Sequence, residues 1–163
     1  MTMPQHIVEQ IHSFLIKKQK TIAVAESCTG GLLSNLLTDL SGSSGYFILG
    51  VIAYSNRAKI KILKIPAGLI AKKGAVSKEA AAKMAQSVRK LAKTDLGIGI
   101  TGIAGPTGGS PKKPVGTVFI AVDSKSKKIC QKFHFNGSRA VIRKKTVLKT
   151  LELLMTLQSI SPA

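Results

Sequence analysis

The sequence predicts an α/β fold in three layers, with helices on both faces of a mixed β-sheet, in one domain spanning residues 1–163. Early in the chain, short apolar runs typical of buried strands alternate with segments that have helical spacing, which predicts parallel strands joined by helices. Later, two strand-like runs flank a polar turn and predict an antiparallel hairpin. A chain of 163 residues, 44% of them apolar, can bury one core.

Each element follows from its local pattern. The strand-like runs are short and apolar or β-branched, and they lie at residues 21–25, 46–54, 95–102, 115–122 and 128–135. The helical segments carry apolar residues three and four positions apart, and they lie at residues 4–19, 30–40, 55–65, 75–93 and from about 139 to 155. Ser77 is the expected N-cap of the fourth helix, Ser55 or Asn56 caps the third, and Pro66 ends it.

The charge of the chain indicates anionic partners. The sequence has 25 Lys and Arg against 7 Asp and Glu, a net charge of +18, which suits phosphorylated metabolites, nucleic acid or simply a solvated basic surface. Aromatic residues make up 4% and Trp is absent, so stacking platforms for single-stranded nucleic acid are scarce and nucleic acid is not the favoured partner.

Compartment and cofactors follow from what the sequence lacks. Its apolar runs are far shorter than the roughly 20 residues that cross a bilayer, and its start has no signal-peptide pattern, so we expect a cytoplasmic protein without a membrane partner. Cys28 and Cys130 form neither a disulfide framework nor a metal-binding pattern. No metal and no cofactor is expected.

The stretch VAESCTGGLL contains two candidate nucleophiles, Ser27 and Cys28, where a strand gives way to a helix. In open α/β sheets ligands bind at the carboxyl ends of strands, and the first amides of a helix can hold an anion or oxyanion. Thr29, Gly30 and Gly31 are therefore candidate binding residues, the glycines because they let a ligand approach the backbone. From this stretch alone, a cap by Ser27 or Thr29 beside a buried cysteine is the simpler interpretation.

A serine nucleophile needs a base, and the sequence offers a lysine more readily than a histidine. Lys59 follows Tyr54 and is expected in the first turn of a helix, where the helix dipole, burial and surrounding positive charge all favour the neutral amine. Lys61 is the nearby alternative, and an exposed lysine without a role is the other interpretation. The histidines stand in no recognisable triad arrangement, at positions 6, 12 and 134.

Two further segments offer binding groups. The Gly/Pro-rich loop within residues 101–118 lacks the P-loop spacing, but Thr101, Gly102 and Gly105 could contact a ligand, whereas a plain connection is the alternative. Arg139 and Arg143 lie one turn apart where the last helix begins, and two such guanidiniums could clamp a phosphate or carboxylate.

Four stretches together resemble the C-terminal domain family of the competence/damage-inducible protein CinA. They are AESCTGGLL, GVIAYSNRAKIKIL, GAVSKEAAAKMA and GITGIAGPTGGSPKKPVGTVFIAV, and the resemblance runs from about residue 5 to 155. Stand-alone members of this family are nicotinamide-nucleotide amidohydrolases. Longer members carry an N-terminal molybdopterin-binding-like domain, for which this chain has no room, so the stand-alone form is expected.

The resemblance implies an activity and a set of residues. It implies metal-independent hydrolysis of nicotinamide mononucleotide to nicotinic acid mononucleotide and ammonia, in pyridine nucleotide salvage, by a homo-oligomer, most simply a dimer. It assigns Ser27 as the nucleophile and Tyr54 and Lys59 to the family's YSN-x-x-K motif, which decides against Lys61. The alternative is a basic nucleotide- or nucleic-acid-binding module without amidase activity.

The chain departs from the family pattern at two positions. Family members often have an acidic residue before the arginine at Arg139, where this chain has Ser138, and another after the Gly-Pro of the loop, where it has Thr107. These changes affect the expected contacts to ribose and phosphate rather than the Ser27, Tyr54 and Lys59 set.

Overall fold

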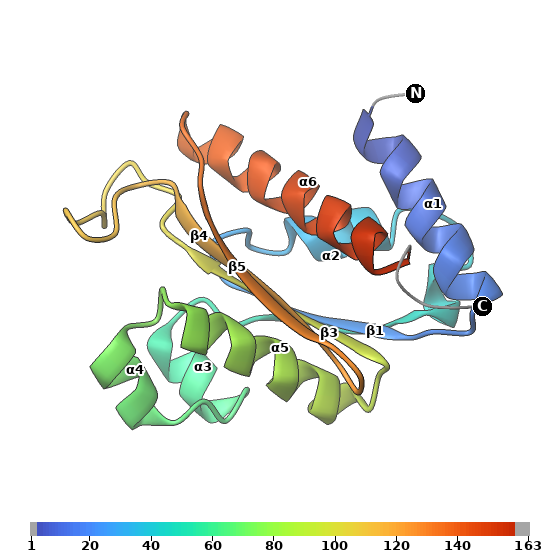
Figure 1. The fold of residues 1–163 in the computed structure, drawn as a ribbon, viewed down its shortest axis with the longest axis horizontal. Helices are drawn as coiled ribbons and strands as arrows, with labels where there is room; N and C mark the ends of the chain where they lie inside the picture. Colours follow the sequence, from blue (N-terminus) through green and yellow to red (C-terminus); the bar gives the residue numbers. More distant parts are fainter. Residues whose placement is uncertain (1–2, 159–163) are drawn as a thin grey trace.

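The computed structural model describes residues 3–158, which form a five-stranded sheet covered by helices (Figure 1). The strands are β1 (Ile22–Glu26), β2 (Phe47–Ile52), β3 (Leu96–Gly102), β4 (Thr117–Ser124) and β5 (Lys128–His134). The helices are α1 (Met3–Lys17), α2 (Leu32–Leu37), α3 (Asn56–Lys61), α4 (Ala67–Lys73), α5 (Lys78–Ala92) and α6 (Arg139–Gln158), with a 3₁₀ turn η1 (Ser43–Gly45). Among the described residues, no helix is long and apolar enough to span a membrane.

The sheet is mixed, as the sequence predicts. Its strand order is β2-β1-β3-β4-β5, in which β1 pairs in parallel with both β2 and β3. The last two strands run antiparallel, and β4 and β5 form the expected hairpin. The carboxyl ends of β1, β2 and β3 therefore meet at one end of the sheet, which is where open α/β sheets place their ligands.

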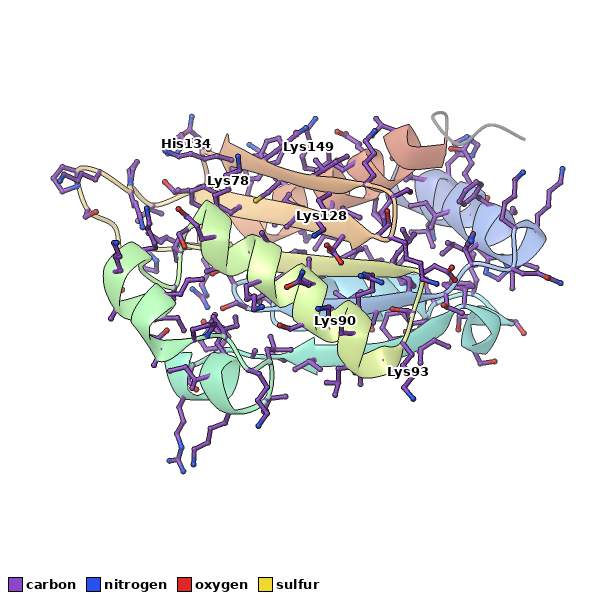
Figure 2. All side chains as sticks on the ribbon, turned by 60° about the horizontal axis from the view of Figure 1, so that its bottom comes forward. Lys78, Lys90, Lys93, Lys128, His134 and Lys149 are labelled. Carbon is purple, nitrogen blue, oxygen red and sulfur yellow. The ribbon has the colours of Figure 1, made fainter. Side chains whose placement is uncertain are left out.

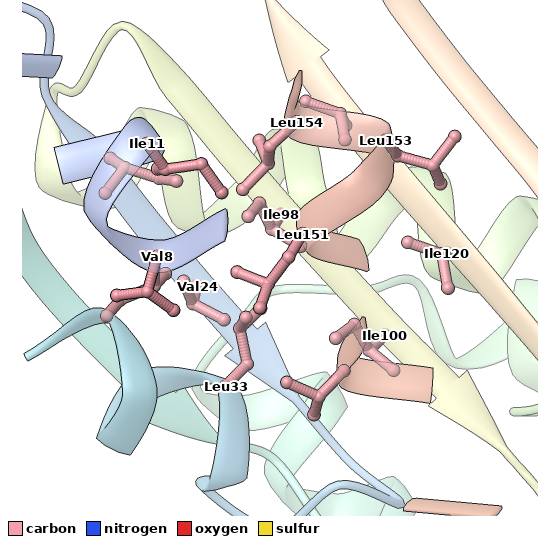
Figure 3. Packing of buried hydrophobic residues seen from close by; sticks show 14 of the residues in the cluster. Val8, Ile11, Val24, Leu33, Ile98, Ile100, Ile120, Leu151, Leu153 and Leu154 are labelled. Carbon is pink, nitrogen blue, oxygen red and sulfur yellow. The ribbon is translucent and has the colours of Figure 1, made fainter. Parts of the chain in front are cut away.

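Helices cover both faces of the sheet and confirm the three-layer prediction. Helices α1, α2 and α6 lie over one face, and α3, α4 and α5 lie under the other (Figure 1). The larger core fills the first interface, where Val8 and Ile11 of α1 and Leu151 of α6 meet strand residues such as Ile98 (Figure 3). A smaller core on the other face joins Met84 and Val88 of α5 to alanines of β1.

Glycines in β3 let α5 approach the sheet closely. A Cβ atom added at Gly97 would collide with the Ala85 carbonyl of α5, and one added at Gly99 would collide with the Ala81 carbonyl. The backbone of α5 therefore packs directly against β3, with no room for a side chain between them.

The structure differs from the sequence prediction in four helices, one of which, α3, ends at Lys61 and not at residue 65. The second helix is confined to Leu32–Leu37, because Gly30 and Gly31 both have left-handed φ angles. A short helix, α4, follows Pro66, where the sequence predicts only an interruption, since two turns are too few to show a period. Helix α1 stops at Lys17, just before Gln19 takes a positive φ angle.

We expect Gly99→Ala to destabilise the fold because the added methyl group has no space between β3 and α5. Overpacking costs about 1–3 kcal/mol, which lowers the melting temperature of a domain of this size by about 3–10 °C. The matched control is Gly68→Ala in α4, where nothing lies within 4 Å of an added Cβ. Equal melting temperatures for the two variants, measured by calorimetry, would contradict the close packing of α5.

Candidate active site

Ser27 lies at the carboxyl end of the parallel strands. It follows the last residue of β1 directly, and a turn of four residues then leads to α2. Gly30 and Gly31 have φ angles of 60° and 93°, which residues with a Cβ rarely adopt, so the glycines shape this turn. The side chain of Ser27 is only 7% exposed, yet it lines a cavity. The strand, turn and helix expected around Ser27 are therefore present.

Glu26 holds this turn in place, a role that sequence reasoning missed. Its carboxylate is fully buried and accepts hydrogen bonds from the amides of Gly31, Leu33 and Ser34 at 3.1, 3.2 and 2.8 Å. The Ser34 hydroxyl donates a fourth bond at 2.7 Å. A negative charge at the N-terminus of α2 thus satisfies the amides that the helix leaves unpaired.

Lys59 reaches Ser27 from the neighbouring strand connection. Ser55 caps α3, its hydroxyl accepting from the Ala58 amide at 3.0 Å, and Lys59 follows within the same short helix. The side chain of Lys59 is only 2% exposed, and its Nζ lies 2.9 Å from Ser27 Oγ. The same Nζ lies 2.7 Å from the carbonyl oxygen of Ala53 and 3.1 Å from that of Tyr54.

This arrangement suits a neutral amine. Burial lowers the pKa of Lys59 because the ammonium form loses its hydration. The two N–H bonds of a neutral amine can point to the two carbonyls, which leaves the lone pair for the Ser27 hydroxyl proton. The helix dipole does not favour the neutral amine, contrary to the prediction, because α3 has six residues and Lys59 lies in its last turn. Burial takes the place of the dipole.

Cys28, the other candidate nucleophile, is poorly placed to react. Burial raises the pKa of its thiol to about 11, so the thiol form dominates at neutral pH. Its sulfur packs against the backbone at Gly102, where an added Cβ would lie 3.1 Å from Sγ. Ser27 and Cys28 both line the cavity, but it is the Ser27 hydroxyl that contacts the Lys59 amine.

The cavity beside Ser27 has a volume of about 250 Å³ and is lined by residues at the ends of β1, β2 and β3, by the turn before α5 and by Arg139. Thr101, Gly102 and Gly105 line it, as the sequence predicts for the glycine-rich loop. The Thr101 hydroxyl donates to the Ala75 carbonyl at 2.8 Å and so joins the end of β3 to the turn before α5. Lining residues not singled out as site residues from the sequence include Asn56, Ala75, Val76 and Gly108.

Lys113 anchors the glycine-rich loop to the helices below it. Its Nζ donates to the carbonyls of Lys73 and Val76 at 2.9 and 2.6 Å. These contacts hold the loop across the end of α4 and the start of α5. Because Val76 also lines the cavity, the second of these contacts joins the loop to the cavity wall.

Arg139 and Tyr54 meet at the rim of the cavity. The Arg139 guanidinium donates to the Gly105 carbonyl at 2.8 Å and to the Tyr54 hydroxyl at 2.7 Å, and both side chains line the cavity. The Tyr54 side chain is 57% exposed, and its hydroxyl is bonded to Arg139 rather than to Lys59 or Ser27. Tyr54 contacts the amine of Lys59 only through its carbonyl.

Four other predicted binding residues lie outside the cavity lining. Arg143 of α6 donates to the Thr29 carbonyl at 2.7 and 3.3 Å and thereby braces the turn after Ser27. The Gly30 amide donates to the Ser27 carbonyl, and the Gly31 amide donates to Glu26. Thr29 is fully buried. The structure thus brings Arg139, but not Arg143, to the cavity.

The described residues place neither a histidine nor a group of metal ligands at this cavity. None of the residues lining the cavity is a histidine. His12 of α1 contacts Tyr46 instead. Within residues 3–158, no group of three or more His, Cys, Asp or Glu side chains is placed to hold a metal ion.

The chain is similar in sequence to proteins of one known family. Residues 4–158 match the profile of the CinA C-terminal domain. A CinA-like protein of Geobacter metallireducens is 49% identical over 134 residues, which are 82% of this chain and 32% of that protein. A CinA-like protein of Geotalea daltonii is 47% identical over 148 residues, 90% of this chain and 36% of that protein. The chain spans about a third of the length of these relatives.

Solved structures of similar proteins have the same fold. A CinA superfamily protein from Klebsiella pneumoniae superposes with a TM-score of 0.93 at 28% identity, covering 97% of this chain and 99% of that chain. A competence/damage-inducible protein from Agrobacterium tumefaciens superposes with a TM-score of 0.92 at 32% identity, covering 96% of this chain and 99% of that one.

We expect Glu26→Gln to destabilise the protein, because the neutral amide presents an N–H group to amides that need an acceptor. Losing charge-assisted bonds to a buried group costs about 1–3 kcal/mol, or about 3–10 °C in melting temperature. Ser34→Ala is the control, since it removes only the hydroxyl bond to the same carboxylate. A larger loss in Ser34→Ala than in Glu26→Gln would show that the carboxylate does not hold the turn.

Proposed function

The chain belongs to the CinA C-terminal domain family, and we propose that it hydrolyses the carboxamide of nicotinamide mononucleotide to nicotinic acid mononucleotide and ammonia. One observation carries the reaction class: a buried lysine amine with a lowered pKa lies 2.9 Å from a serine hydroxyl that lines a cavity. A serine with an adjacent base is an activated nucleophile suited to acyl transfer. The choice of substrate rests on the resemblance to the stand-alone amidohydrolases.

The reaction begins with Lys59 in its neutral form. Its amine takes the proton of the Ser27 hydroxyl while Oγ bonds to the carboxamide carbon, whose carbonyl oxygen becomes an oxyanion. When the tetrahedral intermediate collapses, the C–N bond breaks and the leaving nitrogen takes the proton from Lys59, so ammonia departs. Water then attacks the ester on Ser27 with Lys59 again as base, which releases the carboxylate and restores the hydroxyl.

The oxyanion requires N–H donors close to Ser27. The sequence points to amides around Thr29, Gly30 and Gly31, but those of Gly30 and Gly31 are engaged within the turn. The amides of Cys28 and Thr29 donate to no backbone carbonyl of the described residues. Cys28 lines the cavity, whereas Thr29 is fully buried and lies outside the lining, so we assign the oxyanion to the Cys28 amide, which directly follows the nucleophile.

Substrate binding falls to Arg139 and the glycine-rich loop. Arg139 uses two of its five N–H donors for Gly105 and Tyr54, so others remain for the phosphate of the nucleotide. The net charge of +18 also attracts a phosphorylated substrate. Tyr54 then positions the guanidinium through its hydroxyl and the Lys59 amine through its carbonyl, in place of relaying a proton.

The alternative, a basic binding module without activity, is less well supported. Burying a lysine amine is costly, and a surface that only binds nucleic acid gains nothing from it. Such a module also works through exposed cations, whereas Lys59 is turned inward toward Ser27.

Ammonia release from nicotinamide mononucleotide tests the nucleophile. We expect Ser27→Ala to lower kcat at least about a thousand-fold, because it removes the attacking oxygen. Cys28→Ala is the matched control and should keep activity within about threefold, because its thiol is buried and protonated. Activity should be the same with and without EDTA.

Two outcomes would replace this proposal. Loss of activity in Cys28→Ala but not in Ser27→Ala would make the thiol the nucleophile. A wild type that releases no ammonia but binds DNA with an affinity that falls steeply with salt would support the binding module.

The pH dependence of turnover tests the base. Only neutral Lys59 accepts a proton, so kcat should rise with pH through the lowered pKa of Lys59 and level off above it. Measuring kcat at saturating substrate excludes the ionisation of free substrate from the profile. Cys28→Ala should keep the same profile, and Lys59→Met should abolish turnover at every pH. A kcat that falls with rising pH over this range would contradict the role of Lys59.

A further inference from the structure

Arg143 of α6 has surroundings unlike those of many cations in this basic chain. Lysines such as Lys78, Lys90 and Lys128 lie exposed on α5 and β5 (Figure 2). Arg143 is only partly exposed, and its Nε and Nη2 both donate to the carbonyl oxygen of Thr29, at 3.3 and 2.7 Å. Among residues 3–158, no ion pair includes Arg143. Its charge therefore acts on a peptide group rather than on a carboxylate.

The guanidinium lies against the peptide group that joins Thr29 to Gly30. A Cβ atom added at Gly30 would lie 3.2 Å from Arg143 Nη2, so a side chain at this position would crowd the guanidinium. The Thr29 carbonyl also accepts from the Leu32 amide at 3.3 Å. At the other end of the same peptide group, the Gly30 amide donates to the Ser27 carbonyl at 3.0 Å. Hydrogen bonds therefore fix both ends of this peptide group.

The peptide group that joins Ser27 to Cys28 continues this series of contacts. Its carbonyl is the acceptor of the Gly30 amide. The bond is trans, and in a trans peptide the N–H points away from the C=O of the same group. The Cys28 N–H therefore points away from Gly30, and it is the donor assigned above to the oxyanion. The bond from Gly30 to Ser27 thus sets the direction in which this donor points.

A positive charge at one end of the series strengthens the donor at the other end. Arg143 polarises the Thr29 carbonyl, which makes the N–H of Gly30 a stronger donor. That N–H in turn polarises the Ser27 carbonyl and so strengthens the N–H of Cys28. Hydrogen bonds linked in this way strengthen one another by about 10–30% each. The gain is largest when the substrate oxygen becomes negative, which happens only as the tetrahedral intermediate forms.

We propose that Arg143 is a positioning residue for the oxyanion, which orients and polarises the Cys28 amide through two peptide groups without touching the substrate. The inference rests on the proposed amide hydrolysis at Ser27. The sequence suggests phosphate binding for Arg143, but Arg143 does not line the cavity, whereas Arg139 does. The two arginines therefore serve different steps: Arg139 binds the substrate, and Arg143 lowers the barrier to attack.

Steady-state kinetics of ammonia release separates this role from substrate binding. Arg143→Met retains an apolar side chain in place of the arginine stem but removes the guanidinium. Loss of an oxyanion donor itself lowers kcat about 100–1000-fold, so we expect the indirect loss in Arg143→Met to be about 10–100-fold. KM for nicotinamide mononucleotide should stay within about threefold, because Arg143 makes no contact with the substrate.

The matched control for this experiment is Lys144→Met. It removes the same charge from the next residue of α6, which is exposed, and should leave both kcat and KM close to those of the wild type. All variants are measured well below their melting temperatures, so that a loss of kcat does not reflect unfolding. A variant that is merely less stable would then keep its kcat.

Free guanidinium ions test the role of the charge directly. Arg143→Ala leaves space beside the Thr29 carbonyl, and guanidinium chloride at about 10–50 mM, far below the molar concentrations that unfold proteins, should raise its kcat severalfold. Sodium chloride at the same ionic strength should not. Arg143→Lys keeps a cation with N–H donors and should retain a higher kcat than Arg143→Met.

Three results with an active wild type would overturn the inference. They are a wild-type kcat in Arg143→Met, a loss that appears in KM alone, and equal effects of guanidinium chloride and sodium chloride on Arg143→Ala. A wild type that releases no ammonia would contradict the proposed function itself, and this inference with it. Measuring the wild type first therefore tells the two failures apart.

Discussion

The candidate site depends on the burial of one amine. Lys59 is withdrawn from water, which would be unfavourable for an ammonium group, and the carbonyls of Ala53 and Tyr54 compensate the neutral amine. Those carbonyls belong to the residues between β2 and α3, so the connection that leads into the helix of Lys59 also orients its lone pair toward Ser27. The backbone carbonyls around Lys59 thus favour its neutral form and set the direction of its lone pair.

Ser27, the proposed nucleophile, is also held in place, by contacts to the turn that follows it. The buried carboxylate of Glu26 accepts hydrogen bonds from amides of this turn and of the start of α2. The guanidinium of Arg143 donates to a carbonyl of the same turn. Beneath the sheet, the glycines of β3 let α5 press against the strand whose end provides Thr101 to the cavity. Ser27 and Lys59 therefore lie on segments with little freedom to separate, which is the geometry that proximity effects require.

Much of this arrangement is readable from the sequence, and the exceptions have physical causes. The layered fold, the hairpin and the turn around Ser27 follow from patterns a few residues long. The role of Glu26 could not be predicted in this way. Its carboxylate accepts hydrogen bonds from amides five to eight residues later in the chain, a spacing outside the usual capping box. Arg139 and Arg143 are equivalent in sequence, one turn apart, and only tertiary packing sends one to the cavity and the other to Thr29. The pairing of Lys59 with Ser27 was expected for a partly mistaken reason, since burial rather than the helix dipole favours the neutral amine.

The two hydrogen bonds of Arg139 have a thermodynamic consequence. An arginine on a surface normally samples many rotamers, and a ligand that binds it must freeze them at a cost in affinity. Here the guanidinium is already fixed between Gly105 and Tyr54 before any ligand arrives. That conformational entropy is lost during folding, so an anion arriving at the rim meets a preorganised receptor, and its binding energy remains available for the reacting end of the molecule.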